Sequence, residues 1–109
     1  MATRENVPTV EVTLHEQRTY SLTEVCSQCR LEREVLITLV KEGLIRPQGT
    51  APEQWRFPVT TVERIHVALR LQNDLDLNLP GTVLAVDLLD EVKALRRRVL
   101  ALERLLNPR

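Results

Sequence analysis

The sequence predicts a mainly α-helical protein, in which a winged helix-turn-helix is followed by one long C-terminal helix. Three features carry this prediction. Two short helical patterns lie between Tyr20 and Pro47 and are joined by a tight polar turn. Gly, Pro and alternating aromatic residues follow over 45–57, where a short wing hairpin would lie. From residue 82 to residue 106 the helical pattern is uninterrupted.

The first two helices are predicted from their capping residues and their apolar spacing. Ser21 and Glu24 form a capping-box pattern, which predicts a short helix over 22–28. A second helix is predicted over 32–42, and Gly43 is expected to end it in a left-handed conformation. Its apolar face is expected to comprise Leu31, Val35, Leu36, Leu39 and Val40.

The wing and the third helix follow. Trp55 and Phe57 alternate around Arg56, and we expect them to cover the core rather than to bind a ligand. Thr60 or Thr61 is expected to cap the third helix. The buried side of this helix is predicted to hold Ile65, Leu69 and Leu75, flanked by Val62 and Leu71. A polar-apolar break over 74–79 and then Pro80-Gly81 are expected to end it.

The last helix, predicted over 82–106 and closed by Asn107-Pro108, carries a heptad repeat. Apolar residues recur at alternating steps of four and three, which is the a/d pattern of a coiled coil. The stripe could pack back on its own domain, but its length and regularity favour a homodimer. Arg98 at a g position and Glu103 at an e position could pair across it. The predicted dimerisation residues are Leu88, Val92, Leu95, Val99, Leu102 and Leu106, with Ala85 extending the stripe.

These patterns divide the chain into three segments. Residues 1–18 form a polar tail with a short strand predicted over 9–14, residues 19–80 the winged helix-turn-helix domain, and residues 81–109 the coiled-coil helix. No run of about 18 apolar residues is present, so no membrane span is predicted. The polar start has no apolar region typical of a signal peptide, and we therefore expect a cytoplasmic protein.

The charge balance argues against DNA binding. The 15 basic and 15 acidic residues cancel, giving a formal net charge of zero. A module that binds duplex DNA usually has a basic face, because contacts to phosphates supply much of its affinity. The stretch that would read bases, Ile37-Thr38-Leu39-Val40, holds almost nothing able to contact a base or a phosphate. Nucleic acid is therefore an unfavoured partner.

Nothing in the sequence predicts catalysis, a metal or a cofactor. Cys26 and Cys29 match CxxC, but a zinc site needs two further ligands, and His15 and His66 lack the spacing of a zinc finger. Cys26 is expected to be a small core residue. No nucleophile stands beside a recognisable base signature, and no Gly-rich phosphate loop is present, so we predict a protein that is not an enzyme.

Acidic residues near the start of the last helix form a candidate binding patch. Asp87, Asp90 and Glu91 share one helical face, and Asp74 and Asp76 lie nearby in sequence. They could simply complement the helix dipole. They could equally form a docking site for a basic partner protein.

The order Tyr20-Ser21-Leu22-Thr23-Glu24-Val25, then Gly43-Leu44-Ile45-Arg46-Pro47, resembles the MerR-type winged helix-turn-helix. The resemblance implies a long dimerising helix at the end. DNA-binding members of that superfamily carry an Arg and Tyr residues in the second helix. The corresponding residues here are 37–40, so this signature is missing, as are the inducer-binding cysteines near the end of the last helix.

A narrower resemblance covers residues 19 to 106. The Trp-containing wing over 46–57, the acid-ending third helix and turn over 69–81, and the Asp87-Leu88-Leu89-Asp90-Glu91 segment are similar to the chaperone modulatory protein family, CbpM. The resemblance implies a regulator that binds the J-domain of a CbpA-type, DnaJ-like co-chaperone and blocks its use by Hsp70. Because a J-domain presents a basic helix toward Hsp70, an acidic ligand surface fits it.

Two other functions stay open at this point. The first is a DNA-binding transcriptional regulator of the MerR type. The second is a structural coiled-coil adaptor, whose function would survive deletion of residues 1–81.

Overall fold

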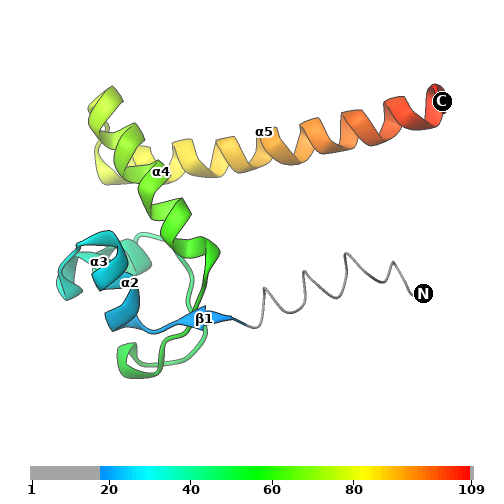
Figure 1. The fold of residues 1–109 in the computed structure, drawn as a ribbon. Coiled ribbons are helices and arrows are strands. Elements are labelled where there is room, and N and C mark those ends of the chain that lie inside the picture. The colour runs from blue at the N-terminus through cyan, green and yellow to red at the C-terminus, as the bar shows by residue number, and fades with distance from the viewer. Residues whose placement is uncertain (1–17, 109) are drawn as a thin grey trace. The chain divides into compact units, whose positions relative to one another are not determined.

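The computed structural model describes residues 18–108, and the chain divides into two compact units after Val67. The strand predicted over 9–14, with most of the predicted polar tail, lies outside the described residues. The element order is β1 (Thr19–Tyr20), α2 (Leu22–Cys29), α3 (Arg33–Lys41), the short helix η1 (Pro52–Gln54), β2 (Phe57–Pro58), α4 (Thr60–Leu75) and α5 (Leu79–Leu106). Figure 1 shows these elements along the chain.

Helix α2 begins and ends as its capping residues dictate. The Glu24 amide donates to Ser21 Oγ at 3.1 Å, and the Ser21 amide donates to Glu24 Oε1 at 2.7 Å. The predicted capping box is therefore confirmed. The helix ends at Cys29 and is capped by Arg30, which adopts a left-handed conformation with φ 58°. The Leu31 amide then donates to the Cys26 carbonyl at 3.1 Å and closes the turn toward α3.

Helix α3 packs against α2 and agrees with the prediction to within one residue at each end (Figure 1). Its predicted apolar face is only partly correct, because Leu36 and Leu39 are buried whereas Val35 is 42% exposed. Burial is confined to the centre of the face, and Val35 lies at its edge. Gly43 follows with φ 88°, as predicted. A Cβ there would meet nothing within 4 Å, so the backbone conformation alone favours glycine.

The wing is held by a small antiparallel sheet. Strands β1 and β2 pair with Thr19 opposite Pro58 and Tyr20 opposite Phe57. Gln48 forms a bridge to Arg56 through two hydrogen bonds of 2.9 Å. Strand β1 was not predicted, because two residues are too few to show an alternating pattern.

The core of the first unit gathers residues from α2, α3, β2, α4 and the loop that follows α3. Phe57 is buried as predicted, and Trp55, which is half-buried, contacts it edge to face with ring centroids 5.9 Å apart. The buried apolar residues of this unit are Leu22, Val25, Cys29, Leu36, Leu39, Leu44, Ile45, Phe57 and Ile65. The unit therefore has the helix-turn-helix core and the wing that the sequence predicts.

Helix α4 crosses from the first unit into the second. It begins at Thr60, and Thr61 is buried in its first turn, so neither threonine precedes the helix as expected of a cap. Ile65 is buried as predicted, but Leu75 is 60% exposed, because it is the last residue of the helix. Ala68 is buried although its small side chain gave no signal in the sequence.

Helix α5 is a 28-residue helix that begins earlier than predicted. The expected start was Thr82, after a break at Pro80-Gly81, but the helix begins at Leu79. Proline is tolerated in a first turn because the amide hydrogen it lacks has no helical partner there. Asn78 caps the helix, its Oδ1 accepting from the Gly81 amide at 2.8 Å. The Thr82 hydroxyl donates to the Asn78 carbonyl at 2.8 Å.

Candidate functional site

The outer face of α3, which would read bases in a DNA-binding protein, is poorly equipped to do so. The Thr38 hydroxyl donates to the Glu34 carbonyl of its own helix at 3.0 Å. Arg33 lies 3.7 Å from the Glu53 carboxylate at the wing. Val35 is an exposed apolar side chain on the same helix. This helix therefore offers a duplex few free donors and little positive charge.

The predicted dimerisation stripe lies along α5 and is exposed in the described chain. Its side chains are between 41% and 80% exposed. A stripe of this size along one helix usually contacts another helix. The residues are Leu88, Val92, Leu95, Val99, Leu102 and Leu106.

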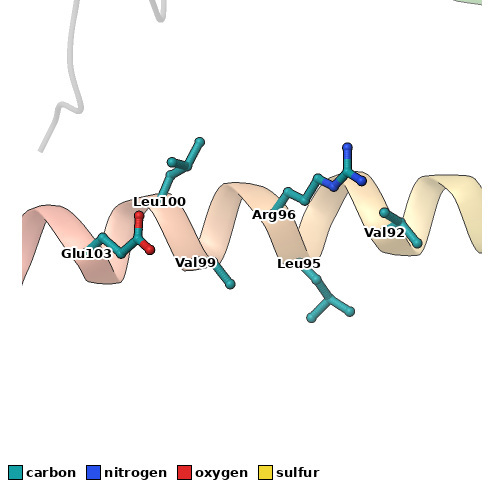
Figure 2. A pocket seen from close by; sticks show the side chains of 6 residues that line it. All are labelled: Val92, Leu95, Arg96, Val99, Leu100 and Glu103. Atoms are coloured by element: carbon teal, nitrogen blue, oxygen red, sulfur yellow. The ribbon is translucent and has the colours of Figure 1, made fainter.

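A shallow groove of about 450 Å³ overlaps one edge of this stripe. All of its lining side chains come from α5 (Figure 2), so one wall is present and the other side is open. Apolar side chains form its floor, and Arg96 and Glu103 add one positive and one negative charge. The groove is lined by Val92, Leu95, Arg96, Val99, Leu100 and Glu103.

Several other apolar residues of α5 are exposed and were not predicted from the sequence. Leu84 and Leu100 are 60% and 53% exposed, yet both lie off the a/d positions. Leu89 and Leu105 are exposed as well. The heptad repeat drew attention to the a and d positions alone, whereas a count of apolar residues around the whole helix would have found these four.

The predicted acidic residues occupy two places. Asp87, Asp90 and Glu91 are exposed and lie within about one turn of α5. Asp87 and Asp90 each have an interaction partner within the protein. Asp74 is exposed in the last turn of α4, and Asp76 lies in the turn that follows it with φ 55°. The three carboxylates of α5 thus form one patch, which we call the acidic patch of α5.

Charge is segregated along α5. After the acidic patch come Lys93 and the three consecutive arginines Arg96, Arg97 and Arg98, all of which are exposed. Opposite charges therefore occupy successive segments of the helix that carries the apolar stripe. Such a distribution can select both the partner of a helix and its orientation.

The two cysteines are free thiols in α2. Cys29 is buried and Cys26 half-buried, so the sequence assigned the core position to the wrong member of the pair. Burial raises the pKa of both thiols, and the charge of Arg33 opposes this rise at Cys26. A thiol with a raised pKa is a poor nucleophile at neutral pH. Among residues 18–108, no three His, Cys, Asp or Glu side chains gather as a metal site would require.

No helix in the described part of the chain is long and apolar enough to cross a membrane. His66 is exposed on α4, and His15 lies outside the described residues.

Comparison with known proteins covers the same elements. A family model described as MerR HTH family regulatory protein matches residues 20–104, from β1 into the last turns of α5. The chain is 37% identical over 84 residues to a chaperone modulatory protein CbpM of Coxiella burnetii. The matched stretch covers 77% of this chain and 79% of that protein. Proteins of the same name from Pseudomonas entomophila and Pseudomonas putida are 32% and 33% identical over 72 residues, which is 66% of this chain and 71% of each.

Proposed function

Because the chain belongs to the CbpM family of chaperone modulatory proteins and has the MerR-type helix-turn-helix fold, we propose that it modulates a chaperone by binding the J-domain of a CbpA-type, DnaJ-like co-chaperone. The bound J-domain would be unavailable to Hsp70, so co-chaperone activity would fall. The protein acts without catalysis, in the cytoplasm, and as a homodimer.

One observation carries the choice of a protein partner over DNA. The helix-turn-helix frame is intact, yet α3 presents an exposed Val35, a threonine bonded to its own helix and an arginine that faces a carboxylate. These groups supply neither base readout nor phosphate neutralisation. A scaffold that keeps its core but lacks such groups is suited to holding a protein.

We place the docking surface on the acidic side chains Asp74, Asp76, Asp87, Asp90 and Glu91. Negative side chains on a rigid helix attract a basic helix from solution and orient it, and salt weakens this attraction. The acidic patch of α5 is exposed and fixed on a continuous helix. It is therefore the part of this surface on which we base the test.

The test is titration of labelled J-domain with the full chain at physiological salt, followed by fluorescence anisotropy. We expect saturable binding that weakens as salt rises. The matched variants each reverse two charges, either Asp87 and Asp90 to Lys or Glu34 and Glu42 to Lys. Only the first should weaken binding; loss from the second instead would move the docking surface to α3. Absence of binding at tens of micromolar would refute the proposal.

The second candidate is a MerR-type DNA-binding regulator, favoured by the family model over residues 20–104. It requires sequence-specific binding of duplex DNA at physiological salt, measured with the same chain by anisotropy. The third is a coiled-coil adaptor, which requires full function from residues 82–109 alone. Loss of chaperone modulation on that deletion would exclude it.

A further inference from the structure

Glu91 occupies a special place among the acidic residues of α5. In the heptad frame set by Leu88 and Val92, Glu91 takes a g position, at the border of the apolar stripe. Asp87 and Asp90 take c and f positions, farther from it. Side chains at g reach across to a second helix, whereas those at c and f point to solvent.

We propose that Glu91 forms an ion pair with an arginine of the Arg96-Arg97-Arg98 triplet in a second copy of the chain, and so specifies self-association. The occupant of the α5 groove is thus a second α5. This inference rests on the proposed homodimer and goes beyond it, because it names the charge pair that selects the partner. It also gives Glu91 a role in self-association, which Asp87 and Asp90 do not share.

Heptad geometry places Glu91 beside an arginine of the triplet in both a parallel and an antiparallel pair of helices. In a parallel, in-register pair, a g residue faces the e residue of the following heptad, which for Glu91 is Arg96 of the second copy. In an antiparallel pair whose stripe layers match Val92 with Leu95, g residues face each other, and Glu91 meets Arg98 of the second copy. Both arrangements give a carboxylate a guanidinium partner.

The groove supports the same occupant. Arg96 lines it together with four apolar side chains, so the positive charge borders the surface that a second helix would cover (Figure 2). Val92 and Val99 at a and Leu95 and Leu102 at d form the combination that favours two helices over three or four. Among residues 18–108, Glu91 has no ion-pair partner within its own chain.

The test is a charge swap followed by sedimentation over a dilution series of the full chain. Glu91→Arg should raise the dimer dissociation constant about tenfold, because two attractive pairs become two repulsive ones. A second reversal on the same chain, Arg96→Glu or Arg98→Glu, should restore dimerisation. Restoration by Arg96→Glu indicates parallel helices, and restoration by Arg98→Glu indicates antiparallel helices; either result supports the pair.

The control is Asp90→Arg, which makes the same charge change at an f position and should leave the dissociation constant unchanged. Helicity by circular dichroism confirms that each variant is folded. If wild type dimerises and Glu91→Arg behaves like Asp90→Arg, or if neither swap restores dimerisation, the pair does not exist although the homodimer stands. If wild type stays monomeric at about 100 µM, the proposed homodimer fails, and this inference fails with it.

Discussion

Arg33 on α3 lies 3.7 Å from the carboxylate of Glu53 at the wing, and both side chains are more than half exposed. The single arginine of α3 therefore faces a negative charge supplied by the same protein. In a DNA-binding relative of this fold, a basic residue on that helix would face a phosphate or a base. The pair is a local sign that this surface is not used to hold a duplex.

Replacement of Glu53 by Gln should release Arg33 without changing the function. Because exposed ion pairs contribute little, the free energy of unfolding should change by less than about 0.5 kcal/mol, measured by urea denaturation. Anisotropy with duplex DNA should still show no specific binding. The control Glu42→Gln removes an equal charge beside α3, so specific binding gained only by Glu53→Gln would mean that this ion pair masks a DNA-reading surface.

Gly43 ends α3 with φ 88°, and its replacement by Ala should destabilise the first unit. A Cβ at Gly43 meets no neighbour, so only the left-handed backbone opposes the change, at a cost of about 1–2 kcal/mol. The same reasoning gives the opposite sign at Arg30, which has φ 58°, so Arg30→Gly should stabilise by a few tenths of a kcal/mol or more. Thermal and urea denaturation of both variants measure the change in the free energy of unfolding. A change of the same sign in Gly43→Ala and Arg30→Gly would contradict the argument.

Strong local signals made most of the first unit predictable from sequence. The capping residues Ser21 and Glu24 and the helix-ending Gly43 act within one turn, so the sequence alone indicated the boundaries of α2 and α3. Strand β1 and the burial of Ala68 depend on residues distant in sequence, which leave no local pattern. The start of α5 was misplaced because proline ends most helices but is also favoured in a first turn.

The candidate surfaces were predictable to different extents. The heptad period alone indicated the apolar stripe of α5, and the spacing alone placed Asp87, Asp90 and Glu91 within about one turn of that helix. The exposure of Leu100 and its place in the groove beside Arg96 needed the structure, since an apolar residue off the a/d positions could equally have been buried by its own domain. The Arg33–Glu53 pair also needed the structure, because the partners come from different elements.

Charged residues in the apolar stripe of α5 should abolish dimerisation without unfolding the first unit. Leu95→Glu and Leu102→Glu together place two carboxylates in the apolar contact, where a buried unpaired charge is strongly unfavourable. We expect a monomer by sedimentation, with unchanged thermal unfolding of the winged helix-turn-helix at the same concentration. Arg97→Glu, at the outward f position, is the matched control. If the double variant remains dimeric, the contact between the two copies lies outside the apolar stripe.

The two thiols of α2 should make stability fall in alkaline solution. Burial raises the pKa of Cys29 above its ordinary value of 9.0, the nearby Cys26 raises it further, and burial raises the pKa of Cys26 as well. As pH rises, the thiols therefore ionise first in the unfolded chain. Their contribution to the free energy of unfolding is complete below about pH 9 and is lost as pH rises through their folded pKa values. Urea denaturation from pH 7 to pH 10 should show a steeper decline for wild type than for Cys26→Ala/Cys29→Ala, and alkylation by iodoacetamide at pH 8 should be slower in the folded protein than in urea. Wild type and the double variant keep every Lys and Tyr, so only the thiols can account for a different dependence of stability on pH. Parallel curves would show that burial leaves the ionisation of the thiols unchanged.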